Sequence, residues 1–304
     1  MIKTKVAVTL GDPAGIGAEV VRKAVNHSIV RKCCSPFIFG DSYFKKYFKN
    51  FEFVETSALI RTLNLGTSSK IGGVCSYLAI EKAVQFCLKK ECASLTTAPV
   101  SKESFKAAGT EYLGHTELLC DLTKSKKVAM LMICGKLNSV MVTRHIPLFQ
   151  IPKILNTKDI VENVHLGADF LKNRIAKKKI RIALCGLNPH CGENSILGSE
   201  EKDIILPAFK ILKKHYPNIV SPRSADSVWL KAKNDEYDLV CAMYHDQVMI
   251  PLKCIDARKI VNVTAGLPFT RTSPGHGTAF DIAGQNKADP TPMIQSILTA
   301  ASTK

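Results

Sequence analysis

The chain of 304 residues lacks the features that define several common protein classes. It contains no uninterrupted apolar run long enough to cross a bilayer, so we expect no membrane partner. The basic N-terminal segment meets Gly11, Asp12 and Pro13 after one short apolar run, which indicates a first strand and not a signal peptide. No internal repeat, low-complexity segment or obvious linker is present.

Acidic residues are scarce: Asp and Glu number 26 against 42 Lys and Arg, a formal net charge of +16. A nucleic-acid-binding protein gathers such charge on one face or in a recognisable motif. Here the lysine runs are short, no recognition motif is present, and the remaining lysines are scattered over predicted helix faces. We therefore expect no nucleic-acid partner, and we expect the excess charge to help attract an anionic substrate.

The eleven cysteines form no C-x-x-C pair. They fall in apolar strand-like and helix-like segments, as do Cys87, Cys134, Cys185 and Cys241, and not in the loops of a small secreted scaffold. Buried, reduced thiols of this kind are typical of cytoplasmic proteins, so we expect a cytoplasmic location.

Three familiar catalytic or nucleotide-binding motifs are also missing. The chain has no Walker loop ending in G-K-[ST], no G-x-G-x-x-G and no G-x-S-x-G elbow. The turn 11-GDPAGIG-17 lies between an apolar run and a helical pattern. It is either a ligand loop at a helix N-terminus or a tight structural turn.

Short apolar runs alternate with amphipathic segments along the whole chain. Strands are predicted at 5–10, 36–40, 93–98, 128–133, 138–143, 180–185, 238–243 and 260–264, and helices at 17–25, 77–90, 158–176 and 201–216. This alternation predicts an α/β fold with a largely parallel sheet and helices on both faces. Only 134-CGKL-137 separates two of the runs, so 128–133 and 138–143 are expected to form a hairpin.

Three of the eight histidines, His145, His190 and His245, each follow an apolar, strand-like run. Ligands bind outside the carboxyl ends of strands in open α/β sheets, and three imidazoles with an open fourth position suit a catalytic metal. Each histidine taken alone is more often structural. Their spacing matches no short zinc motif, so the ligands would come from separate strands or even from separate subunits.

Other polar segments stand where strands are predicted to end. In 114-GHTE-117, His115 and Thr116 either grip a substrate or cap a helix. The run 262–284 is rich in glycine and hydroxyl side chains, and it is either a nucleotide-binding loop or a long surface loop. Lys253 and Arg271 are candidate cations for a phosphate or a carboxylate.

As a set, these segments resemble the 4-hydroxythreonine-4-phosphate dehydrogenase family of vitamin B6 biosynthesis. They occur in the family's order and span nearly the whole chain: 11-GDPAGIG-17, 96-TTAPVSK-102, 114-GHTE-117, 143-TRHIPL-148, 185-CGLNPHCGE-193, 243-MYHDQ-247 and 262-NVTAGLPFTRTSPGHGTAFDIAG-284. Family members usually carry Asp where this chain has Gly275, which bears on the cofactor loop.

The resemblance implies an α/β/α two-domain fold similar to isocitrate and isopropylmalate dehydrogenases, with a non-Rossmann site for NAD or NADP. We expect a discontinuous first domain at 1–117 plus 285–304 and a second domain at 118–284 that carries the metal ligands and cofactor loop. A cleft is expected between them. The resemblance also implies a homodimer with its active site at the subunit interface.

The resemblance further implies the roles of individual residues. It makes His145, His190 and His245 the ligands of one divalent metal, which is zinc, cobalt, magnesium or manganese. The substrate-binding positions are His115, Thr116, Lys253, Asn262 and Arg271. The cofactor-binding positions are Asn188, Gly192, Glu193, Gly266, Leu267, His276, Gly277, Thr278 and Asp281. Lys253 and Asp226 are the candidate catalytic proton acceptors.

The activity implied is NAD-dependent, metal-dependent oxidation of 4-phosphooxy-L-threonine to 2-amino-3-oxo-4-phosphooxybutanoate, which decarboxylates to 3-amino-2-oxopropyl phosphate. A sibling dehydrogenase acting on 4-phosphothreonate or 4-phosphoerythronate is an alternative. An alternative of another class is a basic α/β binding protein without catalysis.

Overall fold

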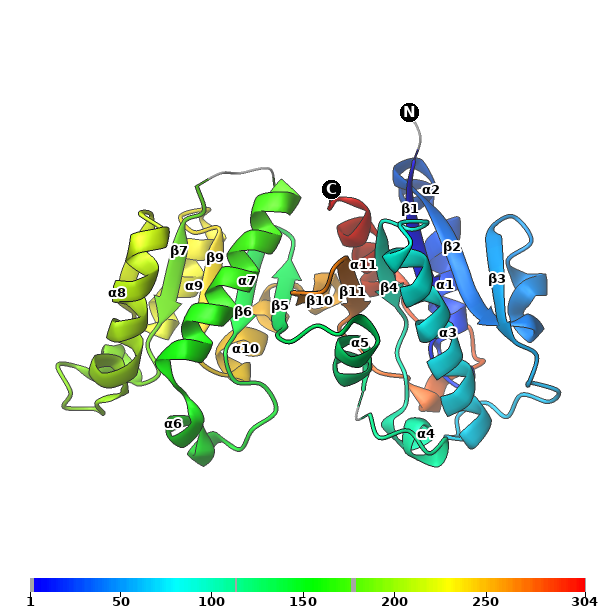
Figure 1. The fold of residues 1–304 in the computed structure, drawn as a ribbon, viewed down its shortest axis with the longest axis horizontal. Coiled ribbons are helices and arrows are strands. Elements are labelled where there is room, and N and C mark those ends of the chain that lie inside the picture. Colours follow the sequence, from blue (N-terminus) through cyan, green and yellow to red (C-terminus); the bar gives the residue numbers. More distant parts are fainter. Residues whose placement is uncertain (1–2, 113, 176–178, 304) are drawn as a thin grey trace. The chain divides into compact units, whose positions relative to one another are not determined.

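The computed structural model describes residues 3–112, 114–175 and 179–303. The chain forms two compact α/β units: unit 1 comprises Met1–Lys127 and Val261–Lys304, and unit 2 comprises Val128–Ile260 (Figure 1). The resemblance predicts segments 118–127 and 261–284 in the second domain, whereas in the structure they lie in unit 1.

Unit 1 contains six strands in the order β3-β2-β1-β4-β11-β10 among the described residues. All neighbouring pairs are parallel except β10 and β11, which are antiparallel. The strands are β1 (Thr4–Thr9), β2 (Cys34–Asp41), β3 (Glu52–Ser57), β4 (Ser94–Thr97), β10 (Ile260–Ala265) and β11 (Thr270–Pro274). The helices are α1 (Gly17–Asn26), α2 (Ser28–Cys33), α3 (Lys70–Leu88), α4 (Lys102–Ala107), α5 (His115–Thr123) and α11 (Thr291–Ala301), with short turns η1 (Ser42–Tyr47) and η6 (Phe280–Ile282).

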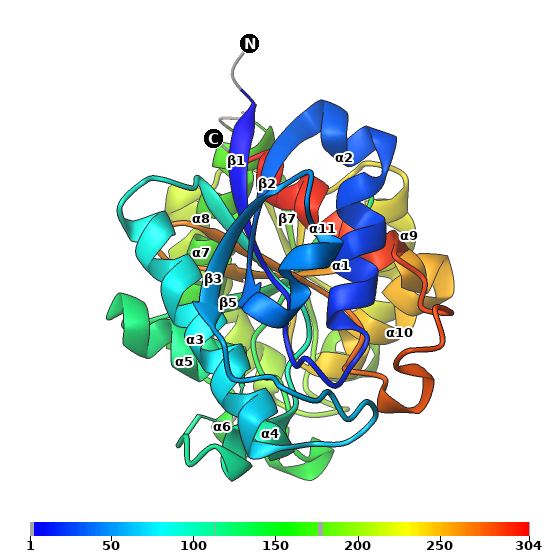
Figure 2. The ribbon, with the colours of Figure 1, turned by 90° about the vertical axis from the view of Figure 1, so that its right-hand side faces the viewer.

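Helices cover both faces of the unit 1 sheet, as Figure 2 shows for α1 and α3. Successive strand residues point to opposite faces, so Val6 and Val8 pack with α1 and α11, whereas Ala7 packs with α3 and α5. The sheet is therefore buried on both sides, which explains why its strands read as short, nearly continuous apolar runs.

The longest helix of unit 1, α3, is more apolar than the other helices predicted from the sequence pattern. Its 19 residues are long and apolar enough, by length and composition only, to cross a membrane. Its buried residues Ile80, Ala83 and Val84 lie in one apolar cluster with Leu95 of β4 and Phe105 of α4. These contacts make α3 a core helix of the unit.

Unit 2 contains five strands in the order β5-β6-β9-β7-β8 among the described residues. The strands are β5 (Ala129–Cys134), β6 (Leu137–Met141), β7 (Ile182–Cys185), β8 (Ile219–Arg223) and β9 (Leu239–Ala242). The helices are α6 (Ile151–Ile154), α7 (Thr157–Ile175), α8 (Leu206–His215), α9 (Ala225–Lys233) and α10 (His245–Asp256). Short turns are η2 (Leu148–Gln150), η3 (Pro189–Gly192), the π-helical η4 (Glu201–Ile205) and η5 (Ala257–Lys259).

The predicted hairpin is confirmed, because β5 and β6 pair antiparallel from Met130–Met141 to Cys134–Leu137. The pairs β6/β9, β9/β7 and β7/β8 are parallel. The carboxyl ends of β6, β9 and β7 therefore lie at the same edge of the sheet.

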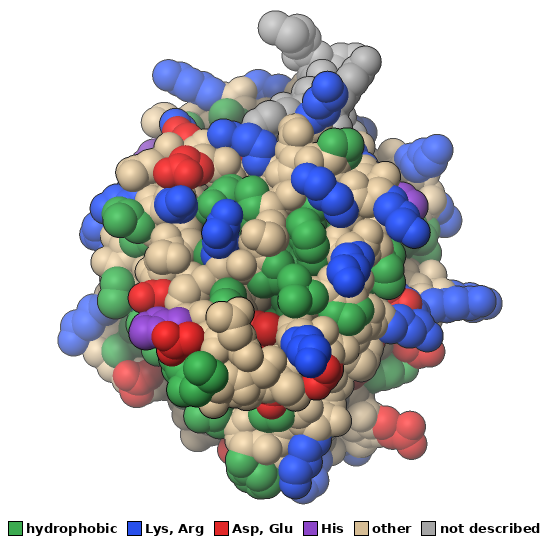
Figure 3. Space-filling view, turned by 90° about the vertical axis from the view of Figure 1, so that its left-hand side faces the viewer, with side chains coloured by type: hydrophobic (Ala, Val, Ile, Leu, Met, Phe, Trp, Pro, Cys, Tyr) green, Lys and Arg blue, Asp and Glu red, His purple; other side chains and the backbone are tan. Residues whose placement is uncertain are grey.

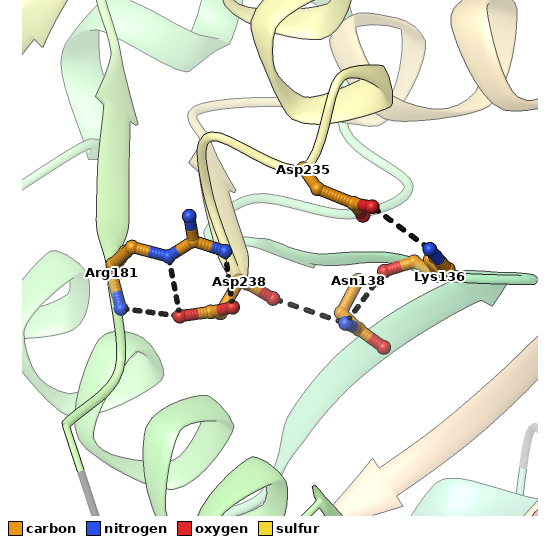
Figure 4. A network of polar contacts seen from close by, with 5 residues as sticks. All are labelled: Lys136, Asn138, Arg181, Asp235 and Asp238. Atoms are coloured by element: carbon orange, nitrogen blue, oxygen red, sulfur yellow. Dashed lines mark hydrogen bonds and ion pairs between the residues drawn. The ribbon is translucent and has the colours of Figure 1, made fainter. Parts of the chain in front are cut away.

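A polar network links neighbouring strands at the opposite end of this sheet, where these strands begin (Figure 4). Oδ2 of Asp238 accepts hydrogen bonds from N and Nε of Arg181 at 2.8 and 3.1 Å, and Oδ1 accepts one from Nη2 at 2.9 Å. Nδ2 of Asn138 donates to the carbonyl of Asp238 at 3.0 Å. The beginnings of β6, β9 and β7 are thus aligned by side chains as well as by the strand ladder.

The run 262–284 is not a single loop, so that part of the expectation was wrong. Residues Thr270–Pro274 form β11 between β4 and β10, where Oγ1 of Thr272 lies 2.9 Å from Oγ1 of Thr96 and from the carbonyl oxygen of Ser296. A strand this polar resembles a loop in sequence. It is stable in the sheet because buried partners satisfy its hydroxyl groups.

Candidate functional site

In unit 2 the structure brings together two of the three predicted metal ligands. His145 follows β6 and His245 begins α10 directly after β9; their ring centres are 5.8 Å apart. Oδ1 of Asp246 lies 2.7 Å from Nδ1 of His245. This contact orients the ring and leaves Nε2 of His245 available as a ligand.

The third predicted ligand, His190, lies on η3 after β7, with 71% of its side chain exposed. Its Nδ1 is 3.8 Å from Oε2 of Glu193. Within the described residues, no group of three or more His, Cys, Asp or Glu side chains is arranged to hold a metal. That His145, His190 and His245 bind one metal ion therefore stays a prediction.

The chemistry of the His145–His245 pair fits a divalent metal. Two imidazoles that bind one ion through nitrogens about 2.0–2.1 Å from it have ring centres roughly 5 to 6 Å apart. The observed 5.8 Å falls in this interval, and the Asp246 carboxylate supplies the outer partner that metal-binding histidines usually have. The exposure of His190 leaves its ring accessible from outside unit 2.

In unit 1, Arg271 of β11 is a buried cation with neutral partners. It is 2% exposed; its Nη2 and Nε donate to Oγ1 of Thr97 at 2.6 and 3.2 Å, and its Nη1 donates to Oγ1 of Thr264 at 3.1 Å. No carboxylate pairs with it among the residues that the structure describes. Burial lowers the pKa of Arg271 to about 9, so it stays charged at neutral pH. A buried cation without an anion is expensive unless a ligand supplies one.

His115, the first residue of α5, is close enough to Arg271 for that charge to act on its ring. Burial, and then the charge of Arg271, hold its pKa well below the usual 6.5, so the ring is neutral at pH 7. Its Nε2 is shielded from solvent and has no hydrogen-bond partner in the described structure. A shielded polar atom of this kind is available to a ligand.

The other predicted substrate residues of unit 1 lie on the same elements. Thr116 follows His115 in the first turn of α5, and Asn262 lies in β10, where it pairs with Ser273 two residues from Arg271. Alternation along the strands puts Asn262 on the face of Arg271, and its buried Oδ1 has no partner in the described structure. These groups form a polar, cationic surface that suits a phosphate or carboxylate.

The predicted cofactor loop packs on the first turn of unit 1. N of Ile16 donates to the carbonyl of Thr278 at 3.0 Å. A Cβ at Gly15 would lie 2.8 Å from that same oxygen, so glycine is needed for this approach. Nε2 of His276 is buried without a partner in the described structure, whereas a Cβ at Gly277 would meet open space.

The remaining predicted cofactor residues are divided between the units. In unit 1, Gly266 has φ +97°, Leu267 packs against the α3 core cluster, and Asp281 is exposed on η6. In unit 2, Nδ2 of Asn188 donates to Glu200 and Glu201, and Gly192 and Glu193 have positive φ.

The two candidate proton acceptors both lie in unit 2. Lys253 is exposed on α10, two turns after His245. Asp226 is exposed at the start of α9, and its hydrogen bond with Ser224, together with the nearby His190, lowers its pKa. A carboxylate with a lowered pKa is a weak proton acceptor at neutral pH.

Sequence reasoning missed several residues that shape these sites. Thr97 and Thr264 hold the Arg271 guanidinium, and Glu201 and Gln247 bind the backbone around the His190 loop. In the sequence, only the position of a hydroxyl side chain near the end of a predicted strand distinguished Thr97 and Thr264. Nothing marked Glu201 among its charged neighbours, because its importance depends on contacts fourteen residues away.

The surface charge is dispersed on the face drawn in Figure 3, where Lys and Arg side chains stand apart from one another among other residue types. On this face the basic side chains therefore form no single patch.

Comparisons with known proteins relate the chain to one family. The family model described as "Pyridoxal phosphate biosynthetic protein PdxA" matches residues 10–300. The 4-hydroxythreonine-4-phosphate dehydrogenase of Sulfurihydrogenibium sp. (strain YO3AOP1) is 38% identical over 96% of this chain and 96% of its own. The D-threonate 4-phosphate dehydrogenase of Pectobacterium atrosepticum is 37% identical over 97% of this chain and 98% of its own.

Solved structures show the same fold. The crystal structure of 4-hydroxythreonine-4-phosphate dehydrogenase from Klebsiella pneumoniae aligns with a TM-score of 0.90 and 33% identity, covering 98% of each chain. Isocitrate dehydrogenase from Methylococcus capsulatus aligns with a TM-score of 0.50 and 14% identity over 96% of this chain and 83% of its own, a likeness of fold alone. The predicted fold class is therefore confirmed.

Proposed function

Since the chain belongs to the pyridoxal phosphate biosynthetic protein PdxA family, we propose that it oxidises a secondary hydroxyl of a small phosphorylated acid. The observation that carries this proposal is the buried Arg271 guanidinium, which has no anionic partner among the described residues and whose charge acts on His115, a neutral ring with an unpaired Nε2. An anionic substrate group supplies the missing charge and the missing hydrogen bond.

The proposed substrate is 4-phosphooxy-L-threonine. Its oxidation gives 2-amino-3-oxo-4-phosphooxybutanoate, a β-keto acid that loses carbon dioxide to form 3-amino-2-oxopropyl phosphate. Arg271, His115 and Thr116 bind one anionic end of this substrate, and Lys253 and Asn262 contact the remainder. Lys253 and Asp226 are the proposed proton acceptors, and the lowered pKa of Asp226 makes that carboxylate a weak base.

His145, His190 and His245 would hold a divalent metal, which would supply Lewis acidity toward the reacting hydroxyl. His145 and His245 already form a pair, and Asp246 orients the second ring. We assign the third ligand, His190, to a second copy of the chain, because its side chain is largely exposed on the surface of its own chain. The active enzyme is then a cytoplasmic homodimer.

NAD or NADP is the proposed hydride acceptor. The residues proposed to bind it are Gly266, Leu267, His276, Gly277, Thr278, Asp281, Asn188, Gly192 and Glu193. The unpaired Nε2 of His276 and the open space beside Gly277 support this assignment.

A second candidate substrate is D-threonate 4-phosphate. The relative named for that substrate is 37% identical to this chain, nearly the same as the 38% of the relative named for the amino acid. Both substrates carry a phosphate and a carboxylate, so the Arg271 site suits either one.

The test is NADH and NADPH formation by the purified chain with each substrate, with Zn, Co, Mn or Mg added. Greater kcat/KM with 4-phosphooxy-L-threonine supports the first candidate, and greater kcat/KM with D-threonate 4-phosphate assigns the chain to the sibling group. No reduction of NAD or NADP with either substrate would favour a binding protein without catalysis. His190→Ala should lose nearly all turnover and most of the metal affinity.

A further inference from the structure

The loop that carries His190 has a rare backbone conformation. All six residues from His190 to Ser195 have positive φ, between 42° and 74°, and only Gly192 among them is a glycine. For other residues this region is disfavoured by roughly 1–2 kcal/mol each. A run of this kind persists only where surrounding contacts hold it, and such strain is concentrated at functional sites.

The buried carboxylate of Glu201 holds the loop. Its Oε1 accepts hydrogen bonds from the backbone N of Leu187 at 2.8 Å and of Asn188 at 2.7 Å, and its Oε2 accepts one from Nδ2 of Asn188 at 3.0 Å. Glu201 is 5% exposed and begins the π-helical turn η4. Such π-turns occur frequently at functional sites.

Two glycines let the loop wrap closely around this carboxylate. A Cβ at Gly186 would lie 3.1 Å from Oε1 of Glu201, and a Cβ at Gly192 would lie 2.7 Å from Oε2. Glu201 therefore contacts the loop on both sides of His190. Glutamine in place of Glu201 keeps one oxygen acceptor for the two backbone N–H groups but sets an NH2 donor against Nδ2 of Asn188, next to a strained turn.

We propose that Glu201 is a positioning residue that holds the His190 loop in its left-handed conformation and so presents the imidazole as a metal ligand. The proposal rests on the proposed function in one respect, that His190 binds the metal. Glu201 itself touches neither the metal nor the substrate. Its effect on the metal is transmitted through the backbone of residues 187–192.

Asp41 in unit 1 provides a matched control. It is 2% exposed and also accepts two backbone hydrogen bonds, from N of Tyr43 at 3.0 Å and N of Leu59 at 2.8 Å, with a third from Oγ of Ser57 at 2.7 Å. A purely structural role for Glu201 predicts that Glu201→Gln and Asp41→Asn behave alike. A positioning role predicts that only Glu201→Gln changes metal binding.

The experiment measures the Kd for Co²⁺, from its visible absorption, with the full-length wild type, His190→Ala, Glu201→Gln and Asp41→Asn. Thermal unfolding of each metal-free protein is measured in parallel. We expect both carboxylate variants to lose some thermal stability. We expect Glu201→Gln to bind Co²⁺ roughly 10- to 100-fold more weakly and Asp41→Asn to stay within about twofold of the wild type.

The experiment distinguishes failure of the metal role of His190 from failure of the positioning role of Glu201. If the wild type binds no Co²⁺, or His190→Ala binds it as tightly as the wild type, the metal role of His190 is wrong and the role of Glu201 falls with it. If binding depends on His190 but Glu201→Gln keeps the wild-type Kd, only the positioning role is overturned. Should Glu201→Gln not fold, Glu201→Asp keeps the carboxylate one methylene shorter, and an unchanged Kd in that variant also overturns the proposal.

Discussion

The side-chain amide of Gln247 bonds to the backbone of Gly186, with Nε2 donating to the carbonyl oxygen at 2.8 Å. Gln247 lies in the first turn of α10, after β9, and Gly186 directly follows β7. Oε1 of Gln247 also accepts a hydrogen bond from N of Met243 at 2.9 Å. One side chain therefore joins the exits of the two strands that lead to His190 and His245.

Gln247→Leu should lower the free energy of unfolding by about 2–4 kcal/mol, because the carbonyl of Gly186 and the N–H of Met243 both lose their partner. Gln247→Glu should lose less stability, since a carboxylate still accepts the hydrogen bond from Met243 but cannot donate one to Gly186. Urea denaturation measures both values. A change under about 0.5 kcal/mol for Gln247→Leu would show that the bridge is not structurally important.

Arg271→Met should leave the protein as stable as the wild type or make it more stable, while weakening substrate binding strongly. The guanidinium is buried without a carboxylate among the described residues, and replacing an unpaired buried charge by an apolar side chain relieves its desolvation. We expect the KM for the phosphorylated substrate to rise roughly 100-fold, as for loss of a charge-assisted contact of about 3 kcal/mol.

Thermal unfolding and steady-state kinetics of Arg271→Met are the two measurements. Arg271→Lys is the control, since it keeps the charge but loses the planar fork that contacts Thr97 and Thr264. A large fall in the Tm of Arg271→Met, with KM unchanged, would make the arginine a structural residue and contradict the anion site.

The stability of the protein should fall as the pH decreases below about 6.5, and His115 contributes to this fall. Its folded-state pKa lies well below 6.5, first because of burial and then because of Arg271. Below 6.5 the unfolded chain binds a proton that folded His115 does not, so folding loses at most about 1.4 kcal/mol per pH unit from this group.

His115→Gln should flatten the pH dependence of unfolding between pH 7 and pH 5. The measurement is urea denaturation of wild type and variant across that interval. His165, whose pKa is also lowered by burial, contributes in the same interval and remains in both proteins, so the difference isolates His115. Parallel curves for the two proteins would mean that His115 is protonated in the folded state as readily as in the unfolded chain.

Mixing two inactive variants should restore activity if His190 acts in the site of a second copy of the chain. In a dimer of His190→Ala with His245→Ala, one site receives an intact His145–His245 pair from one chain and an intact His190 from the other. Random pairing of equal amounts by refolding together should give about a quarter of the wild-type activity. Absence of any recovery would place all three ligands within one chain.

Asp238→Asn should destabilise unit 2 by about 1–3 kcal/mol without changing the affinity for Co²⁺. The carboxylate accepts three hydrogen bonds from Arg181 at the edge of the sheet opposite the histidines (Figure 4). Asp235→Asn is the control, since its pair with Lys136 is exposed and its loss should leave the stability nearly unchanged. Chemical denaturation and Co²⁺ titration check the result, and a weakened Kd in Asp238→Asn would contradict this separation of roles.

Much of the fold could be predicted from local pattern. The alternation of short apolar runs with amphipathic segments predicted the α/β class, and the four-residue link 134–137 predicted the β5–β6 hairpin, which is confirmed. Turn length and side-chain periodicity depend on neighbouring residues alone, so they can be read from a sequence. The polar strand β11 escaped this reading, because its stability comes from partners on β4 and α11.

The sequence by itself determined where the histidines His145, His190 and His245 stand, each just after a strand, and which motifs relate the chain to its family. Only the tertiary structure decided that His145 and His245 form a pair, that Arg271 lies buried among hydroxyl groups beside His115, and that Glu201 holds the His190 loop. The reason is physical: burial and hydrogen bonding arise between segments far apart in the chain, and local composition contains no record of which of them meet.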